Sequence, residues 1–197
     1  MTTKKELQKL LEKLKKGKIS KNKITALITK FGEEQFKEAR GEVEKYLESK
    51  DDMERYSALS TLVFEWGVQE IRPKIEKMMF LDPDTDLRMT AVACLGSLAR
   101  CTKDLRAIKL LLKIFMNPKE DWSVRNSAYD AILHIMCVPY NKRPAIKEGL
   151  LSKKEIDFKL LKDLGKKILK QKSRLKSSRT GGRIVTTIRD KLRRWRK

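Results

Sequence analysis

The sequence predicts an all-α protein, a solenoid of antiparallel helix hairpins with a basic C-terminal extension. Two observations lead to this prediction. Apolar residues recur at intervals of three and four, the period of a helix with one buried face, and no stretch alternates as a strand does. A segment of about 35 residues also occurs three times between positions 51 and 150, and repeats of that length are typical of stacked helix pairs.

The first fifty residues are expected to form capping helices or a degenerate repeat. The predicted helices run over 3–17, from Ser20 to Gly32, and over 33–49. Thr3 and Glu6 have the spacing of a capping box, in which each side chain accepts a hydrogen bond from the other residue's backbone N–H. This pattern marks the start of the first helix.

From position 51 the sequence repeats the frame Asp-x-x-x-Arg-x-Ser/Thr-Ala-x-x-x-Leu/Ile. Its arginines are Arg55, Arg88 and Arg125, at offsets of 33 and 37 residues. Its aspartates, at the place of a helix N-cap, are Asp51, Asp84 and Asp121. A second helix is expected after each first one, over 69–81, 103–116 and 142–150. One arginine per unit at a fixed place suggests a structural ladder with aspartates of adjacent repeats.

This frame resembles the HEAT-like repeat, particularly the short form found in phycobilin lyase subunits. Residues 86–91 and 123–128 come closest to its Asp-x-x-Val-Arg-x-x-Ala helix, and Pro73 supplies the proline near the start of the following helix. The resemblance covers about 51–150 and implies a HEAT-like α-solenoid, with the array itself extending over 51–170. It implies no particular function, because this fold serves scaffolds, lyases, transport factors and a DNA glycosylase family.

Positive charge is concentrated at the two ends of the chain, whose formal net charge is +21. Residues 1–30 carry ten Lys and Arg against two acids, and residues 151–197 carry eighteen against four. Residues 31–100 carry ten against fifteen. A one-sided positive field attracts polyanions such as DNA, RNA or anionic lipid.

Three features argue against other classes of protein. No window approaches 18 uninterrupted apolar residues and no cleavable leader is visible, which predicts a cytoplasmic or nuclear protein without a membrane span. Cys94, Cys101 and Cys137 are odd in number and have no CxxC spacing, which predicts buried thiols in a reducing compartment rather than disulfides or a metal site. Enzyme signatures and cofactor motifs are missing, and His134 is expected to be a satisfied core or seam histidine rather than a general base, so the protein is predicted to be non-enzymatic.

Candidate phosphate contacts lie on the second helices of the repeats. On 103–116, the side opposite the apolar face carries Arg106, Lys109 and Lys113. The neighbouring units contribute Arg72, Lys74 and Lys77 on one side and Lys142, Arg143 and Lys147 on the other. Together they predict a basic concave stripe that follows phosphates, and the alternative is a solvated face with incidental lysines.

The C-terminal segment is predicted to be a basic linker, 171–183, followed by an amphipathic helix, 184–197. The apolar side, expected to dock on a partner or on the chain itself, consists of Ile184, Ile188, Leu192 and Trp195. The candidate nucleic-acid contacts of the segment are Arg183, Arg189, Arg193, Arg194, Arg196 and Lys197. Alternatives are a helix that binds weakly to anionic membranes and a helix that docks in the groove of another protein.

These features predict a non-enzymatic binding module that contacts the phosphate backbone of DNA or RNA within a larger nucleoprotein assembly. Neither a cofactor nor a metal is expected, and a protein partner is. The alternative is a protein–protein adaptor without direct nucleic-acid contact, in which the acidic residues of 31–100 contribute as much as the basic ends.

Overall fold

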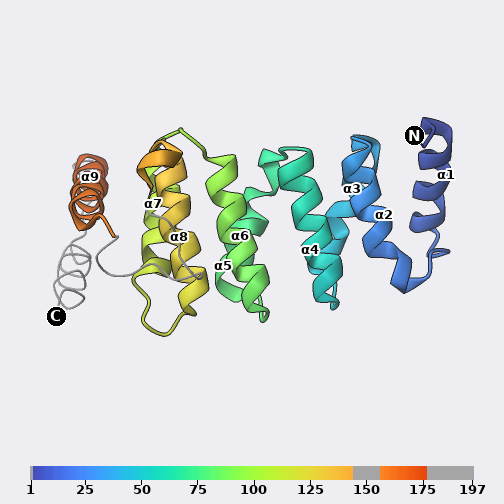
Figure 1. Ribbon diagram of the computed structural model, residues 1–197, viewed down its shortest axis with the longest axis horizontal. Helices are drawn as coiled ribbons and strands as arrows, with labels where there is room; N and C mark the ends of the chain where they lie inside the picture. The colour runs from blue at the N-terminus through green and yellow to red at the C-terminus, as the bar shows by residue number, and fades with distance from the viewer. Residues whose placement is uncertain (1, 144–155, 177–197) are drawn as a thin grey trace. The chain divides into compact units, whose positions relative to one another are not determined.

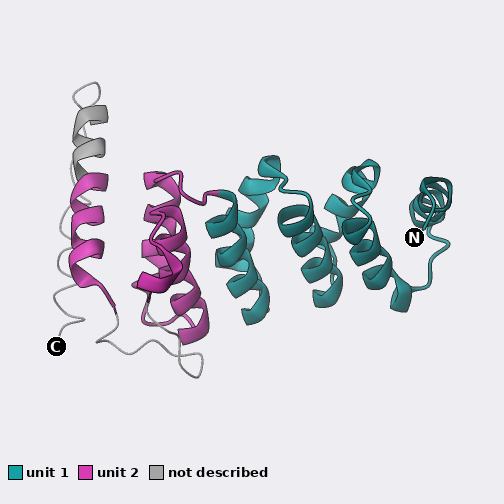
Figure 2. Cartoon of the chain, turned by 45° about the horizontal axis from the view of Figure 1, so that its top comes forward, with its two compact units in different colours: residues 1–98 teal, residues 99–197 magenta. Residues whose placement is uncertain are grey.

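The computed structural model describes residues 2–143 and 156–176, and within them the regular structure is helical, without a strand. The chain divides into two compact units, residues 1–98 and residues 99–197 (Figures 1 and 2). None of the helices that the structure describes combines the length and the apolar character needed to span a membrane. The predicted all-α solenoid of antiparallel helix hairpins is confirmed.

Unit 1 consists of helix pairs whose apolar faces bury one another. Its elements are α1 (Lys4–Lys15), α2 (Lys21–Glu33), η1 (Lys37–Ala39), α3 (Arg40–Val43), η2 (Glu44–Glu48), α4 (Asp52–Ser60), η3 (Thr61–Glu65), η4 (Gln69–Ile71), α5 (Arg72–Leu81) and α6 (Thr85–Leu98). Helix α4 packs between α2 and α6, and α5 packs against α6. Among the fully buried side chains are Phe31, Leu59, Leu62, Ile75, Met79 and Leu95.

The N-terminal helices agree with the sequence prediction only in part. The capping box forms, since the Glu6 amide donates to Thr3 Oγ1 at 3.3 Å and the Thr3 amide donates to Glu6 Oε2 at 2.8 Å. Gly32 does not end the second helix but lies inside α2, where a Cβ would meet the side chains of η3 at 3.0–3.1 Å. This glycine therefore permits close packing of α2 on η3.

The single helix predicted over 33–49 is wrong. Gln35 adopts a left-handed conformation with φ 52°, which ends the path of α2. The chain then continues as η1, α3 and η2, three short helical segments. Phe36, at the break, is buried and contacts Phe31 with a distance of 5.5 Å between ring centroids. The break places this aromatic side chain in the core.

The aspartates of the repeat frame act as helix caps. Backbone amides donate to their Oδ1 atoms at 3.1 Å (Glu54 to Asp51), 2.8 Å (Leu87 to Asp84) and 2.8 Å (Ser123 to Asp121). Each cap satisfies an N–H group that has no acceptor inside its helix. The sequence prediction for these three positions is confirmed.

The repeat arginines are structural, and they bind backbone carbonyls as well as an aspartate. Arg55 Nε and Nη2 each lie 3.0 Å from an oxygen of Asp82, and its Nη1 donates to the Ser49 and Lys50 carbonyls at 2.9 and 3.2 Å. Arg88 Nη1 donates in the same manner to the carbonyls six and five residues before it, at 2.9 and 3.2 Å. Arg125 Nε donates to the carbonyl at the end of the preceding helix, at 3.0 Å. Each arginine thus ties the first helix of its repeat to the end of the chain segment that precedes that helix.

Unit 2 repeats the same arrangement. Its described elements are α7 (Leu105–Phe115), α8 (Trp122–Ile135), η5 (Tyr140–Lys142) and α9 (Phe158–Lys176), and α7 packs against both α8 and α9. The predicted second helix over 142–150 falls mostly on 144–155, outside the described residues. Helix α9 runs to Lys176 and so extends six residues into the predicted linker 171–183.

Cys101 and Cys137 form a disulfide with a Cα–Cα distance of 4.4 Å, so the prediction of three buried thiols is wrong for this pair. Both cysteines are exposed and adopt φ 59° just after the first helix of a repeat. They are 36 residues apart, close to the repeat offset of 37, which places them at equivalent positions of consecutive units. Cys94 is a buried thiol, and burial raises its pKa.

Replacing Asp82 with alanine is expected to lower the free energy of unfolding by about 3–5 kcal/mol, because the buried Arg55 charge loses its partner. Urea denaturation followed by circular dichroism measures the change. Glu70→Ala is the control, since it removes an exposed ion pair with Arg40 that solvent screens. Equal losses in the two variants would contradict the assignment.

The disulfide predicts that the unreduced, denatured chain has one titratable thiol, that of Cys94, and that reduction raises the number to three. Thiol titration in denaturant with and without a reductant measures both values. A Cys101→Ser, Cys137→Ser variant should give one thiol under both conditions. Three thiols in the unreduced parent chain would show that the bond is absent.

Candidate polyanion-binding surface

Helix α7 has one buried and one basic side, as the sequence predicts. The residues of its predicted core face are buried to 2% exposure or less: Ile108, Leu111, Leu112 and Phe115. Of the candidate phosphate contacts on the other side, Arg106 and Lys113 are exposed and Lys109 is half-buried. Asp104 caps the helix, its Oδ1 accepting from the Arg106 amide at 2.8 Å. The cap fixes where the basic side begins.

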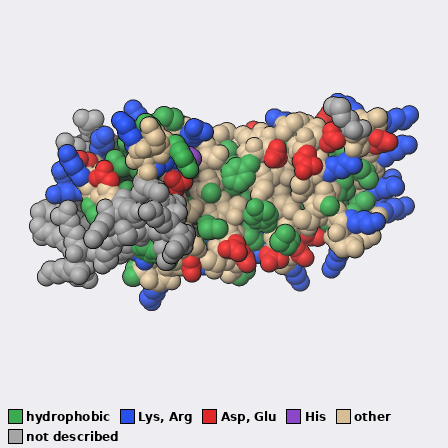
Figure 3. Space-filling model, viewed as in Figure 1, with side chains coloured by type: hydrophobic (Ala, Val, Ile, Leu, Met, Phe, Trp, Pro, Cys, Tyr) green, Lys and Arg blue, Asp and Glu red, His purple; other side chains and the backbone are tan. Residues whose placement is uncertain are grey.

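Helix α9 adds a second basic side that the sequence analysis did not single out. Leu161, Leu164 and Ile168 are buried, while the opposite side exposes Lys159, Lys162, Lys166 and Lys167. The signal was present in the sequence, because lysines at i, i+3 and i+7 oppose apolar residues at the same spacing. Figure 3 shows Lys and Arg side chains gathered over α9.

The net charge of unit 2 is strongly positive. Its described residues, 99–143 and 156–176, carry 17 Lys and Arg against six Asp and Glu. On α9, Asp163 pairs with Lys166 at 3.3 Å, and both groups are exposed, so solvent weakens the pairing. Helices α7 and α9 pack against each other, and each carries exposed basic residues.

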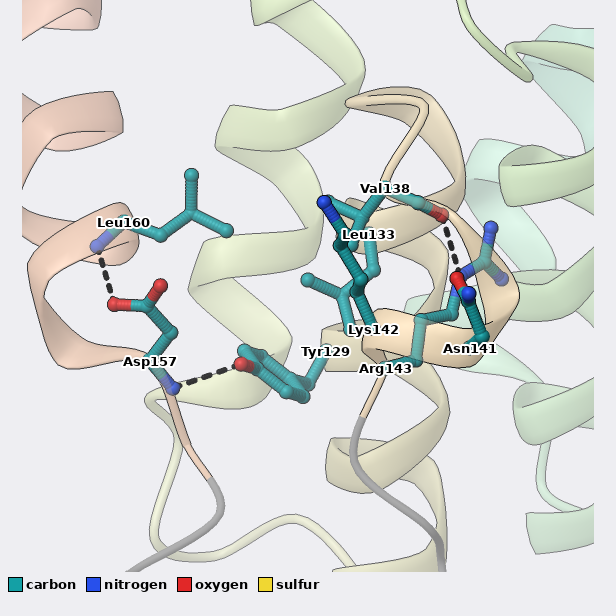
Figure 4. Close-up of a pocket in the computed structure, with 8 residues that line it drawn as sticks. All are labelled: Tyr129, Leu133, Val138, Asn141, Lys142, Arg143, Asp157 and Leu160. Carbon is teal, nitrogen blue, oxygen red and sulfur yellow. Dashed lines mark hydrogen bonds between the residues drawn. The ribbon is translucent and has the colours of Figure 1, made fainter.

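Lys142 and Arg143, the other candidates in the described part of unit 2, differ from each other. Lys142 is exposed and lines a cavity of about 390 Å³ between α8, η5 and the start of α9 (Figure 4). Arg143 turns inward: its Nε donates to the Val138 carbonyl at 2.9 Å and its Nη1 lies 3.7 Å from Asp130. With 9% of its side chain exposed, Arg143 is occupied within the unit and is withdrawn as a phosphate contact.

The groups around this cavity hold the unit together. The Asp157 amide donates to Tyr129 Oη at 2.8 Å, and the Asp157 side chain accepts from the Leu160 amide at 2.8 Å (Figure 4). These contacts fix the first turn of α9 beside α8, and burial raises the pKa of Tyr129. Among the residues that the structure describes, no group of three His, Cys, Asp or Glu is placed to hold a metal ion.

His134 is half-buried, and its imidazole has a carboxylate partner. Its Nε2 lies 3.1 Å from Asp130 Oδ2 on the preceding turn of α8. Burial lowers the pKa of His134, Asp130 opposes this shift, and the positive charges of Arg143 and Arg100 add to the lowering. Asp130 therefore lies between the His134 imidazole and the Arg143 guanidinium.

The remaining basic candidates are in unit 1 or outside the described residues. In unit 1, Arg72 pairs with Glu76 at 3.2 Å and Lys74 lies 3.9 Å from Glu48, so acidic neighbours partly neutralise them. The candidates outside the described residues are Lys147, Arg183, Arg189, Arg193, Arg194, Arg196 and Lys197, together with the docking residues Ile184, Ile188, Leu192 and Trp195. Their roles, and a stripe that continues from unit to unit, stay predictions.

Residues 41–133 match the family model described as HEAT repeats. The match begins ten residues before the first copy of the repeat frame and ends within α8. No curated protein and no solved structure matches the chain significantly.

The pKa of His134 is expected to lie below its ordinary value near 6.5, because burial and two arginines disfavour the charged imidazole. As the only histidine, it gives a single set of imidazole signals in an NMR titration. Asp130→Asn should lower the pKa further, and Arg100→Gln should raise it. The folded chain should also lose stability as the pH falls below 6.5, since the unfolded state then binds the proton more tightly. Shifts of the opposite sign would contradict the contacts described.

Proposed function

We propose that this HEAT-like repeat protein, a helical repeat module of the kind that mediates protein interactions, also binds the phosphate backbone of nucleic acid through unit 2. The observation that carries the proposal is the pair of adjacent helices, α7 and α9, whose exposed sides are basic. HEAT repeats typically form non-catalytic scaffolds, and we propose a non-enzymatic role here as well.

The contacts proposed for phosphate are charged side chains on regular helices. The residues are Arg106, Lys109 and Lys113 of α7, Lys159, Lys162 and Lys166 of α9, and Lys142 of η5. Lysines on a helix meet phosphates as point charges and read no base edges. Binding is therefore independent of sequence and depends strongly on salt, because each phosphate that is neutralised releases counterions.

The C-terminal segment is proposed to act with this surface. Its arginines and lysines would add phosphate contacts, while its apolar residues dock on this chain or on a protein of the same assembly. Specificity for one site then comes from that protein partner or from the shape of the nucleic acid, since phosphate contacts carry no sequence information. Lys147 and Arg183 remain candidates of the same kind.

Binding of short DNA and RNA duplexes over a salt series tests the proposal with the full chain. The Lys159→Gln, Lys162→Gln, Lys166→Gln variant should weaken binding at low salt. It should also reduce the slope of log Kobs against log salt by about 2 to 3, since each lost contact contributes about 0.7 to 0.9. Fluorescence anisotropy with a labelled duplex measures both quantities.

A matched control variant distinguishes the effect of a local binding surface on unit 2 from the effect of the total charge of the chain. Lys9 and Lys13 of α1 and Lys16 at its C-cap are exposed, and changing all three to Gln removes the same charge from unit 1. This variant should keep the slope of the parent chain. Equal effects of the two triple variants would refute a surface on unit 2. No binding by the parent chain at low salt would leave the adaptor function in place of nucleic-acid binding.

A further inference from the structure

A groove lies on unit 1 between the first turns of α4 and α6, two helices that pack against each other. Its volume is about 230 Å³, and its lining residues are Asp52, Met53, Tyr56, Asp84, Asp86 and Leu87. In Figure 3 hydrophobic and acidic side chains are both exposed on the visible face over α4 and α6. The groove is thus lined by both apolar and acidic side chains.

The apolar part of the groove is unusually exposed for a repeat helix. Met53 and Tyr56 are 56% and 44% exposed, whereas Ala58 and Leu59 of the same helix are fully buried. They are three residues apart, so they share one side of α4. At the end of α5, shortly before Asp84, Phe80 and Leu81 are exposed as well. Exposed apolar residues clustered in this way mark interaction surfaces.

The three carboxylates of the groove differ from Asp82 in their partners. Within the part of the chain that the structure describes, Asp52, Asp84 and Asp86 form no ion pair with a Lys or Arg, whereas Asp82 nearby is fully paired with Arg55. Asp52 accepts from the Met53 amide at 2.9 Å and Asp84 from the Leu87 amide at 2.8 Å. Each carboxylate has two oxygens and can accept further hydrogen bonds.

This chemistry favours an organic cation over other ligands. Phosphates are repelled by the three carboxylates. A metal ion has no set of three acidic, histidine or cysteine ligands here, as anywhere in the described residues. Lys and Arg side chains combine a cation with an apolar stem, so they can lie along Met53 while the charge reaches the carboxylates. The Tyr56 ring offers a further site for a cation over its face.

We propose that this groove binds a basic segment of a protein partner, in which Lys or Arg residues flank a large apolar side chain. The apolar residue packs on Met53 and Tyr56, and the basic residues pair with Asp52, Asp84 and Asp86. Methionine adapts to different apolar shapes, so several partner sequences fit. The proposal does not rest on nucleic-acid binding, because it uses residues of unit 1 alone.

A short labelled peptide with Arg and Lys around a Leu and a Trp is the probe, and fluorescence anisotropy with the full chain is the measurement. Two control peptides dissect the contact: one replaces Leu and Trp with Ser, and the other replaces Arg and Lys with Glu. The probe is expected to bind, and both controls are expected to bind at least about tenfold more weakly. Equal binding of the Ser control would show an attraction of charge alone and overturn the proposal.

Two variants of the chain locate the site. Met53→Ala, Tyr56→Ala and Asp52→Asn, Asp86→Asn should each weaken binding by about tenfold, with unfolding midpoints close to that of the parent because the side chains are exposed. The matched controls are Phe64→Ala, an exposed apolar residue further along the same helical path, and Glu33→Gln, Glu65→Gln, two exposed acids. Both controls should bind as the parent does.

Two outcomes would contradict the proposal. In one, the parent chain does not bind the probe peptide, and in the other, the groove variants bind it as tightly as the control variants do. The Lys159→Gln, Lys162→Gln, Lys166→Gln variant keeps the groove intact and should bind the probe unchanged. Failure of the peptide experiment therefore leaves nucleic-acid binding standing, and failure of the duplex experiment leaves the groove standing.

Discussion

The arrangement of unit 1 depends on the burial of the Arg55 guanidinium. A buried charge is tolerated when each of its donors has an acceptor, and here the acceptors come from two places: the carbonyls of Ser49 and Lys50, and the carboxylate of Asp82. The first two precede α4 and the third follows α5. A shift of either segment would leave a buried donor unsatisfied, so the arginine fixes the position of α4 between the ends of two neighbouring helical segments.

The same residue type recurs at the same place with a different set of acceptors. Arg88 and Arg125 donate to carbonyls at the ends of the preceding segments, and the Arg125 guanidinium also lies 4.6 Å from the centre of the Trp122 ring. Unsatisfied carbonyls at helix ends carry partial negative charge, which a guanidinium complements. Because these contacts and the apolar core fix the inner faces, the outer faces can differ in charge without changing the fold.

Sequence patterns predicted the features that depend on residues close in the chain. Caps at Asp51, Asp84 and Asp121, the capping box at Thr3 and the core face of α7 follow from spacing within one helix, and each is confirmed. The features that the patterns missed depend on contacts between segments far apart. A glycine after an apolar stripe resembles a helix end, and the reason that Gly32 stands inside α2, its close contact with η3, involves residues about thirty positions further along the chain. Predicting the Cys101–Cys137 bond would have required noticing that the two cysteines are separated by nearly one repeat and so occupy equivalent positions in consecutive repeats.

The candidate site divides in the same way. The basic side of α7 was predictable because it opposes an apolar stripe on the same helix, and α9 carried the same signal. The inward turn of Arg143 could not be predicted from the sequence. Its acceptors, Val138 and Asp130, lie on other segments, and no spacing rule connects the three residues. The groove on unit 1 was equally hidden, because its residues belong to the starts of two helices about thirty residues apart.

The two proposed surfaces differ in how their binding depends on salt. The proposed affinity of unit 2 for phosphate would be almost wholly electrostatic, so it would fall steeply as salt is added. Binding in the groove combines carboxylate pairing, which salt screens, with burial of apolar area on Met53 and Tyr56, which salt does not weaken. A protein partner anchored there would therefore stay bound at salt concentrations that release nucleic acid. In the proposed assembly the partner would hold the chain in place while the basic residues of α7 and α9 exchange phosphates rapidly, a division that would suit a module positioning nucleic acid without reading its sequence.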